Sequence, residues 1–243
     1  MTWSPDGRQV AFDCVTTGAR NIYWRPADGR SPMEQLTKSE HNQFLGPWSP
    51  DGKTLAFVED GPNHNHDILL LDVGNLRGTP YLNSPYWEAY PEISPDGRWM
   101  AYQSTESGRY EVYVQTFPVV GNKKQISNNG GTEPLWSHDG KQLFYRRGPD
   151  WVGAEARNEV WVVDVQTGSD LSPSKPRLLF RQPEGQLGYG GSDPIRAWDR
   201  SPDGKRFLMV QLEERKPQPL TEMVLVQNWF EEVRRLVPPG RNR

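Results

Sequence analysis

The stretch WSPDGKTLAFVED, residues 48–60, has four near-copies elsewhere in the chain. They are WSPDGRQVAFDC from residue 3, ISPDGRWMAYQS from residue 93, WSHDGKQLFYRR from residue 136 and RSPDGKRFLMVQ from residue 200. The aspartates of the five copies, Asp6, Asp51, Asp96, Asp139 and Asp203, follow one another at intervals of 45, 45, 43 and 64 residues. A sequence period in the forties is typical of β-propellers and of helical solenoids.

The residues inside each copy favour strands over helices. Ser-Pro-Asp-Gly is a turn sequence, because proline presets φ, aspartate tolerates the next position and glycine takes the left-handed position after it. The residues after the turn alternate between apolar and polar, as strands do. A second strand follows in each copy, such as HDILLLDV or YEVYVQTF, and most copies add a short third segment such as PYLN or KQIS. With the strand that ends at the turn, each copy makes about four strands, which is one propeller blade.

We therefore predict an all-β fold, a β-propeller of five blades with about four antiparallel strands each. The single domain covers residues 1–243, with blades at roughly 1–38, 39–83, 84–127, 128–181 and 182–228. Because the first copy starts at residue 3, residues 1–3 can supply only a stub of the innermost strand, which would close the ring and remove an exposed edge. A fragment of a longer chain, or a dimer that completes the ring, are the alternatives.

A short helix is predicted at the C-terminal end, over residues 229–237. Asn228 is a candidate N-cap with Glu231 as its capping-box partner, and Pro238 would end the helix. We expect this helix to pack on the last blade, and a partner-binding helix is the alternative. Elsewhere, the five turn aspartates are expected to cap backbone N–H groups rather than to act in catalysis. The recurring tryptophans are expected to pack between blades; they are Trp3, Trp48, Trp136 and Trp198.

The repeat WSPDGK, followed by LAF and by DI with a later aspartate, resembles that of TolB-like (WD40-like, PD40-type) β-propellers. Such propellers also stand beside the catalytic domains of prolyl-oligopeptidase-type enzymes. The five copies extend over nearly the whole chain, and the resemblance implies a propeller fold. The C-terminal VLVQNWFEEVRRLVPPGR is similar to the end of propeller regions attached to bacterial receptor-type serine/threonine kinases. The motifs of the kinase domain itself are not in the sequence.

Composition excludes several classes of partner. The formal net charge is -3 and no long basic block occurs, so we expect no nucleic-acid binding. The apolar runs, such as ILLLDV, are too short to span a bilayer, so we expect no membrane insertion. No signal peptide is recognisable in the sequence, which by default indicates a cytoplasmic protein, or an extracytoplasmic one if an upstream segment is missing. The oligomeric state does not follow from the sequence.

Candidate metal ligands lie on the loops between blades, which share one face of a propeller. The loops GGTEP and GGSDP are copies of each other and place Glu133 and Asp193 at equivalent points beside the central channel. The corresponding loop WEAYP offers Glu88. Carboxylates that converge on a channel mouth suit Ca²⁺ or another divalent cation. The alternative is that these residues are ordinary polar loop residues.

Three of the four histidines fall on the same face. His41 lies in EHNQFLGP, and His64 and His66 lie in GPNHNHD, so all three are candidate acid/base residues. As zinc ligands, His64 and His66 would need a third ligand from a distant loop, which makes that interpretation weaker. No nucleophile elbow, zinc-protease or phosphate-loop motif is present.

Two functions remain open, since propellers host both binding proteins and hydrolases. The first is a sensory or scaffold module that binds a protein partner or a small-molecule ligand through the inter-blade-loop face. The alternative is a calcium-dependent hydrolase of the propeller lactonase type. In that case calcium in the central channel would polarise an ester carbonyl and activate water.

Overall fold

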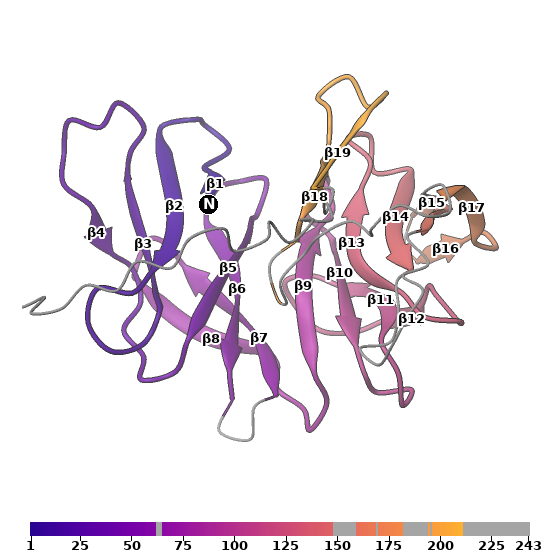
Figure 1. The fold of residues 1–243 in the computed structure, drawn as a ribbon, viewed down its shortest axis with the longest axis horizontal. Helices are drawn as coiled ribbons and strands as arrows, with labels where there is room; N and C mark the ends of the chain where they lie inside the picture. The colour runs from indigo at the N-terminus through magenta and orange to yellow at the C-terminus, as the bar shows by residue number, and fades with distance from the viewer. Residues whose placement is uncertain (62–64, 148–158, 169, 182–193, 195, 211–243) are drawn as a thin grey trace, which may run out of the picture. The chain divides into compact units, whose positions relative to one another are not determined.

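The computed structural model describes residues 1–61, 65–147, 159–168, 170–181, 194 and 196–210 (Figure 1). The chain divides into two units, residues 1–212 and 213–243, and every described residue belongs to the first unit. The candidate site residues His64 and Asp193 and the predicted helix over 229–237 lie outside the described residues. The C-terminal segment that resembles kinase-linked propellers also lies outside them, so that resemblance stays a prediction.

The described residues form strands and no helix, which confirms the all-β prediction. The strands are β1 (Thr2–Trp3), β2 (Gln9–Cys14), β3 (Asn21–Pro26), β4 (Glu34–Gln35), β5 (Gln43–Trp48), β6 (Thr54–Asp60), β7 (His66–Asp72), β8 (Arg77–Leu82), β9 (Glu88–Ile93), β10 (Trp99–Ser104), β11 (Glu111–Thr116), β12 (Lys124–Gln125), β13 (Thr132–Trp136), β14 (Gln142–Arg147), β15 (Glu159–Thr167), β16 (Leu171–Pro173), β17 (Arg177–Arg181), β18 (Trp198–Arg200) and β19 (Phe207–Met209). Within these ranges, no helix is long and apolar enough to cross a lipid bilayer.

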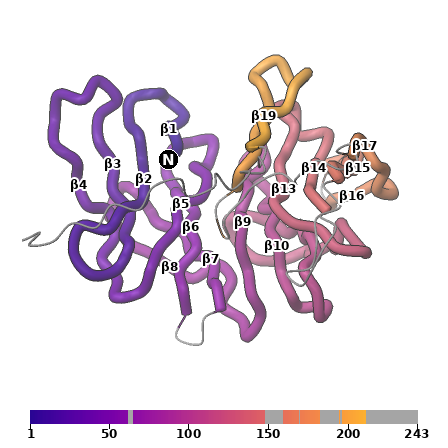
Figure 2. Tube along the Cα trace, in the orientation of Figure 1, coloured from indigo at the N-terminus to yellow at the C-terminus, as the bar shows by residue number. Residues whose placement is uncertain are grey.

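The strands pair into five antiparallel sheets within the described residues, and consecutive strands of each of the first three sheets run in opposite directions (Figure 2). Strands β1–β4, β5–β8 and β9–β12 form three four-stranded sheets in chain order. The fourth sheet holds β13–β17, with β16 and β17 both paired to β15, and the fifth holds β18 and β19. The two-residue strand β1 pairs with β2 and is the expected stub. The repeat of about four strands is thus confirmed, and closure into a five-bladed ring stays a prediction.

The Ser-Pro-Asp-Gly turns have the geometry that their sequence predicts. In the second copy, Asp51 Oδ1 accepts hydrogen bonds from Ser49 Oγ at 2.6 Å and from the Lys53 N–H at 3.1 Å. The hydrogen bond from Ser49 holds the pKa of Asp51 below its ordinary value. Gly52 has a φ of 71°, in the left-handed region that glycine enters without a steric penalty. The other four copies repeat this arrangement, so the turn aspartates are structural as predicted.

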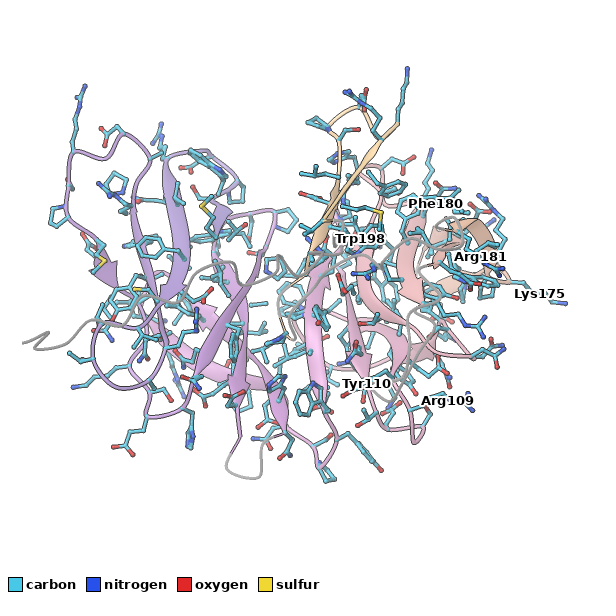
Figure 3. All side chains as sticks on the ribbon, in the orientation of Figure 1. Arg109, Tyr110, Lys175, Phe180, Arg181 and Trp198 are labelled. Carbon is cyan, nitrogen blue, oxygen red and sulfur yellow. The ribbon has the colours of Figure 1, made fainter. Side chains whose placement is uncertain are left out.

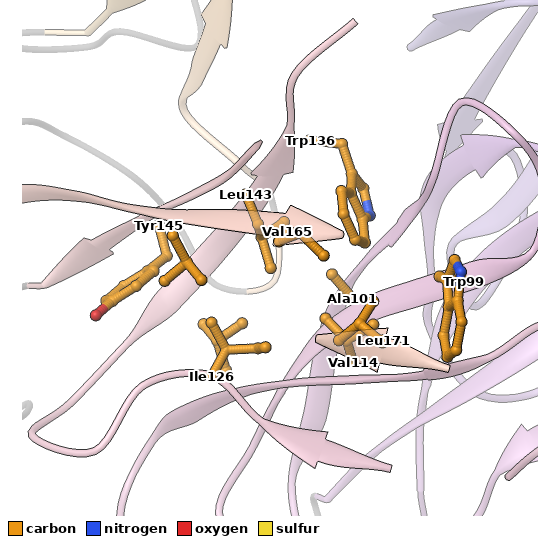
Figure 4. Packing of buried hydrophobic residues seen from close by; sticks show 11 residues of the cluster. Trp99, Ala101, Val114, Ile126, Trp136, Leu143, Tyr145, Val165 and Leu171 are labelled. Atoms are coloured by element: carbon orange, nitrogen blue, oxygen red, sulfur yellow. The ribbon is translucent and has the colours of Figure 1, made fainter. Parts of the chain in front are cut away.

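Apolar side chains fill the space between successive sheets. Between the third and fourth sheets, Trp99, Ala101, Val112, Val114 and Ile126 meet Trp136, Leu143, Tyr145, Val163, Val165 and Leu171 (Figure 4). Comparable clusters join the first sheet to the second, the second to the third and the fourth to the fifth. Each large side chain that is fully buried in this way contributes about 1.5–3 kcal/mol to stability. Strand alternation and stacking of the sheets therefore hold the fold together.

Three of the four tryptophans that were predicted to pack between blades do pack between sheets. Trp48 packs in the cluster between the first two sheets, and its ring lies 6.3 Å from that of Trp24. The indole N–H of Trp136 donates to the Glu92 carbonyl, and that of Trp198 (Figure 3) donates to the Glu133 carbonyl, each at 3.2 Å. Trp3, in the two-residue strand β1, is 58% exposed, so the prediction is wrong for this residue.

Candidate functional site

The first strands of four sheets line a cavity of about 440 Å³. The lining comes from β1, β5, β9 and β18, from Met1, Pro194, Arg196 and Ala197 beside these strands, and from Val58 in β6, Leu208 in β19 and Val210 just beyond it. Polar and apolar surface contribute almost equally to the wall, and its apolar part includes Leu45, Pro47, Val58, Tyr90, Pro91 and Trp198. A volume of this size, with apolar surface and polar groups together, lies in the range of sites for small ligands.

A β-bulge interrupts the first strand of three successive sheets at the same place. The pairing register shifts between Leu45 and Trp48 in β5, between Ala89 and Glu92 in β9, and between Thr132 and Leu135 in β13. Tyr90 and Glu133 take the left-handed conformation there, with φ of 54° and 51°. In β5 the bulge contains Gly46, where a Cβ would lie 2.6 Å from the carbonyl oxygen of Ala56. Bulges redirect side chains, and two of these three lie in the cavity wall.

An ion pair between Glu92 and Arg196 supplies charge to the cavity wall. Glu92 Oε2 lies 2.6 Å from Arg196 Nη1, which also donates to the Pro134 carbonyl at 3.2 Å. The Glu92 side chain is 10% exposed and that of Arg196 is 28% exposed. Because hydrogen bonds between charged groups are stronger than neutral ones, this pair fixes both side chains in the wall. The cavity wall therefore contains this ion pair, with Asp199 as a further acidic lining residue.

Glu133, a predicted metal ligand, is buried and already has partners on both of its carboxylate oxygens. Its Oε1 lies 2.7 Å from Arg146 Nη1, and both side chains are buried. Its Oε2 accepts the backbone N–H of Ala197 at 3.2 Å, just before β18. Burial raises the pKa of Glu133 above its ordinary value, and the Arg146 charge and the Ala197 hydrogen bond act against that rise. The carboxylate thus links β13, β14 and the segment that enters the fifth sheet.

Glu88, the second predicted ligand, is the first residue of β9 and is only 3% exposed. Its Oε1 accepts the hydroxyl of Ser84, whereas its Oε2 is buried without a hydrogen-bond donor. Burial raises the pKa of Glu88 to about 7; Ser84 acts in the opposite direction, and the charge of Asp67 raises the pKa further. Glu88 is therefore a buried carboxyl group with an unsatisfied oxygen.

The two described candidate histidines differ in environment. His41 is exposed in the loop between the first and second sheets. His66, the first residue of β7, is buried, and its Nε2 lies 2.8 Å from Asp60 Oδ1. The ring of His66 also lies 3.9 Å from that of Trp87. His66 thus has a packed position between two sheets, and an acid/base role for either residue stays a prediction.

The predicted metal-binding set is not assembled by the described residues alone. In these ranges, no three His, Cys, Asp or Glu side chains form a group that could hold a metal ion. Glu133 is bound by Arg146, and Glu88 keeps one oxygen without a donor. A calcium site therefore stays a prediction, and its third ligand, Asp193, lies outside the described residues.

Comparison with known proteins places this architecture in a family. No protein-family model matches the chain. The uncharacterised protein Atu1656 of Agrobacterium fabrum is 32% identical over 213 residues, which cover 86% of this chain and 68% of Atu1656. The solved structure of a proposed TolB from Agrobacterium tumefaciens has a TM-score of 0.61 at 23% identity, covering 74% of this chain and 63% of that one. The chain is a TolB-like β-propeller of the Atu1656 family.

A second solved structure is similar to this TolB-like propeller over more of its length. Oligogalacturonate lyase in complex with manganese has a TM-score of 0.58 at 18% identity, covering 89% of this chain and 58% of the lyase. The TolB-like propeller thus spans less than two thirds of both solved proteins. At these identities the likenesses show the fold, and the site has to be judged from its own residues.

Glu92 and Arg196 of the TolB-like propeller are not among the site residues predicted from the sequence. Glu92 occupies the repeat position that Pro47 and Leu135 hold in the neighbouring copies, so a charge replaces an apolar residue. That departure from the repeat is a signal that a comparison of the copies could have found. Arg196 follows the GGSDP loop, in the longest interval between successive turn aspartates. Only the structure identifies it, through its ion pair with Glu92.

Proposed function

We propose that this TolB-like propeller is a binding module that holds a ligand, or a segment of a protein partner, in the cavity lined by β1, β5, β9 and β18. The observation that carries the proposal is the Glu92–Arg196 pair in the wall of a cavity that combines polar and apolar surface. Apolar walls supply affinity through burial, and a few fixed polar groups orient the bound molecule.

The hydrogen bonds and ion pairs of the turn aspartates and of Glu133 support a binding function rather than catalysis. The turn aspartates accept hydrogen bonds from their own turns, and Glu133 is held by Arg146. A general base must reach the proton that it removes, and a metal ligand must offer a free lone pair. Glu133 is buried and has a partner on each oxygen, so it is poorly suited to either role. The exposed apolar lining residues Leu208 and Val210, at 74% and 56%, are by contrast available for contact.

A screen of fluorinated aromatic fragments by ¹⁹F NMR tests the proposal. We expect some fragments to bind the wild-type chain with dissociation constants near about 1 mM, or roughly -4 kcal/mol. Leu208→Trp should fill the open side of the cavity and weaken these fragments at least about tenfold. Leu178→Trp is the matched control, because Leu178 is exposed in β17 and does not line the cavity. Fragments that bind both variants equally would place binding elsewhere.

A calcium-dependent hydrolase of lactonase type is the second candidate, and the unsatisfied oxygen of Glu88 is the observation that favours it. The proposed ligands are Glu88, Glu133 and Asp193, with His41, His64 or His66 as proton carriers. If calcium binds there, a concentration of 100 times its dissociation constant adds about 2.7 kcal/mol of stability. Calcium should then raise the melting temperature and a chelator should lower it. Glu133→Gln with Asp193→Asn should remove the difference, and calcium-independent melting of a metal-free protein would eliminate this candidate.

A further inference from the structure

Each of the three middle sheets packs with two different faces. One set of repeat positions packs on the sheet before it in the chain, and the alternate set packs on the sheet after it. We call these the leading face and the trailing face of a sheet. In the second sheet, Trp48, Leu55 and Phe57 lie on the leading face, and Ala56 and Val58 lie on the trailing face. Because strand side chains alternate between faces, the same two sets can be identified in every copy of the repeat.

The leading face of the first sheet is open. Its positions hold Trp3, Val10 and Phe12; Trp3 is 58% exposed, and Val10 and Phe12 are partly exposed. The same positions of the three middle sheets are no more than 8% exposed, and they are Trp48, Leu55, Phe57, Ile93, Met100, Tyr102, Trp136, Leu143 and Tyr145. The first sheet thus carries the residue types of a buried interface on a face that is not buried.

The trailing face of the fifth sheet is open as well. Leu208 and Val210 stand at the positions that Ala56 and Val58 hold in the second sheet. Ala56 and Val58 are at most 1% exposed, whereas Leu208 is 74% exposed and Val210 is 56% exposed. Phe207, which precedes Leu208 and lies on the leading face, packs on the fourth sheet. The fifth sheet is therefore covered on its leading face and presents an apolar trailing face.

The two open faces do not cover each other within one chain. Thr2 of the first sheet and Leu208 of the fifth both line the cavity, which lies between these two sheets (Figure 1). Two such faces in contact would be buried to the extent seen in the middle sheets, and Trp3 and Leu208 are not. Each copy of the chain therefore offers one open leading face and one open trailing face.

The two open faces are complementary in pattern and in charge. At all four junctions among the described sheets, a trailing face meets a leading face. Arg25 pairs with Val10 and adds an exposed positive charge to the leading face of the first sheet. Asp199 pairs with Leu208 and adds an exposed negative charge to the trailing face of the fifth sheet. Contact between unlike faces brings opposite charges together, whereas contact between like faces brings equal charges together.

We propose that copies of this chain associate head to tail, with the leading face of the first sheet of one copy on the trailing face of the fifth sheet of another. The contact repeats between two chains the packing that joins successive sheets within one chain, and burial of apolar surface drives it. Because a pair of copies keeps one free face of each kind, further copies can be added. Leu208 and Val210 also line the cavity, so association covers its open side. That last consequence rests on the proposed function, whereas the association itself does not.

Sedimentation equilibrium of the whole chain tests the association. The average mass should rise from that of one chain to that of two or more as the concentration increases from roughly 5 to 500 µM, a range that suits a contact of micromolar strength. Trp3→Glu and Leu208→Glu should each keep the mass of one chain, because each places a charge on one of the two faces. Both residues are exposed, so the melting temperature should change by no more than about 2 °C. Val119→Glu is the matched control, since Val119 is 76% exposed between β11 and β12, outside both faces.

An equimolar mixture of the two variants tests the head-to-tail geometry. Trp3→Glu keeps an intact trailing face, and Leu208→Glu keeps an intact leading face. The mixture should therefore form a complex of one copy of each variant and nothing larger, because both remaining faces carry the added charge. A contact between like faces gives a different result, since one of the two variants would then still associate on its own.

Three results would overturn the proposal. The first is a wild-type mass that stays at one chain over the whole concentration range, which would mean that the open faces do not bind a second copy. The second is association that survives in both variants, which would place the contact elsewhere. The third is a mixture in which the two variants stay separate. Trp3 is not in the cavity wall, so fragment binding to Trp3→Glu succeeds or fails separately and distinguishes the proposed binding function from the association.

Discussion

Pro50 packs on Gly97. A Cβ at Gly97 would lie 3.6 Å from Cδ of Pro50, so the proline of the second turn lies against the glycine of the third. The same contact joins Pro5 to Gly52 at 3.7 Å and Pro95 to Gly140 at 3.6 Å. Each copy of the motif therefore forms a turn in its own sheet and also contacts the turn of the next sheet. This double role explains why the chain repeats both residues of the motif together.

Gly97→Val should destabilise the protein by two separable effects. The left-handed φ of 69° costs a β-branched residue about 1–2 kcal/mol, and the γ-methyl groups crowd Pro50, which the added Cβ already contacts. We expect the melting temperature to fall by roughly 4–8 °C, with fragment affinity unchanged. Gly204→Val is the matched control, because Gly204 has a φ of 66° and nothing within 4 Å of its Cβ position. An equal loss in both variants would mean that the contact with Pro50 contributes nothing.

The fourth turn departs from this pattern, since His138 stands in the place of proline. His138 Nε2 lies 3.2 Å from the Ser201 carbonyl, and Nδ1 lies 3.2 Å from Arg200 Nη2. Arginine can only donate, so Nδ1 accepts and Nε2 carries the proton toward Ser201. Arg200 in turn stands where three of the other four copies have tryptophan and the third copy has Ile93. A polar contact between two changed residues thus substitutes for the proline–glycine contact.

His138→Pro should restore the apolar contact between the fourth and fifth turns. Proline fits this turn position in four other copies and reduces the entropy of the unfolded chain, which is worth about 0.4–1 kcal/mol. We expect a melting temperature that is higher by roughly 1–4 °C, measured by differential scanning calorimetry. His138→Ala removes the polar contact without adding proline and should melt below the wild type. A lower melting temperature for His138→Pro would show that the Arg200 contact is worth more than the restored packing.

The Glu133–Arg146 pair predicts a specific order of stabilities. Removing one partner leaves a buried charge alone, so Arg146→Met should lower the free energy of unfolding by about 3–5 kcal/mol. Replacing both groups, as in Glu133→Gln with Arg146→Met, should recover part of that loss because no buried charge remains. Urea unfolding of the two variants and of Glu133→Gln alone measures the order. A double variant as unstable as Arg146→Met would indicate that Glu133 acts independently of Arg146.

The repeated motif allowed the fold to be predicted from the sequence. A Pro-Asp-Gly turn followed by alternating residues specifies a hairpin through short-range physics alone, and five copies specify stacked sheets. The residues that contact Glu133 in the folded protein could not be predicted in this way. Arg146 reaches it because the bulge in β13 shifts the register of the hairpin, which pairs Thr132 with Arg146. A one-residue shift changes which side chains share a face, and local sequence does not determine it.

The Glu92–Arg196 contact could not be predicted from the sequence, for a different reason. The two residues are 104 positions apart, Glu92 in the third sheet and Arg196 just before the fifth, so only the arrangement of whole sheets brings them together.

Charge selectivity of the cavity should follow from the Glu92–Arg196 pair. In the wild type the two charges neutralise each other, so fragments with a single carboxylate gain little from Arg196. Glu92→Gln keeps the shape of the side chain and releases the guanidinium, which can then bind a carboxylate through two hydrogen bonds. We expect carboxylate-bearing fragments to bind Glu92→Gln about tenfold more tightly, equivalent to about 1.4 kcal/mol. Arg196→Met should have the opposite preference and favour amine-bearing fragments.

Glu34→Gln changes the net charge equally at an exposed site in β4 and controls for long-range electrostatics. If Glu92→Gln and Glu34→Gln shift the affinities of charged fragments equally, the pair does not face the bound molecule and the cavity is not the binding site.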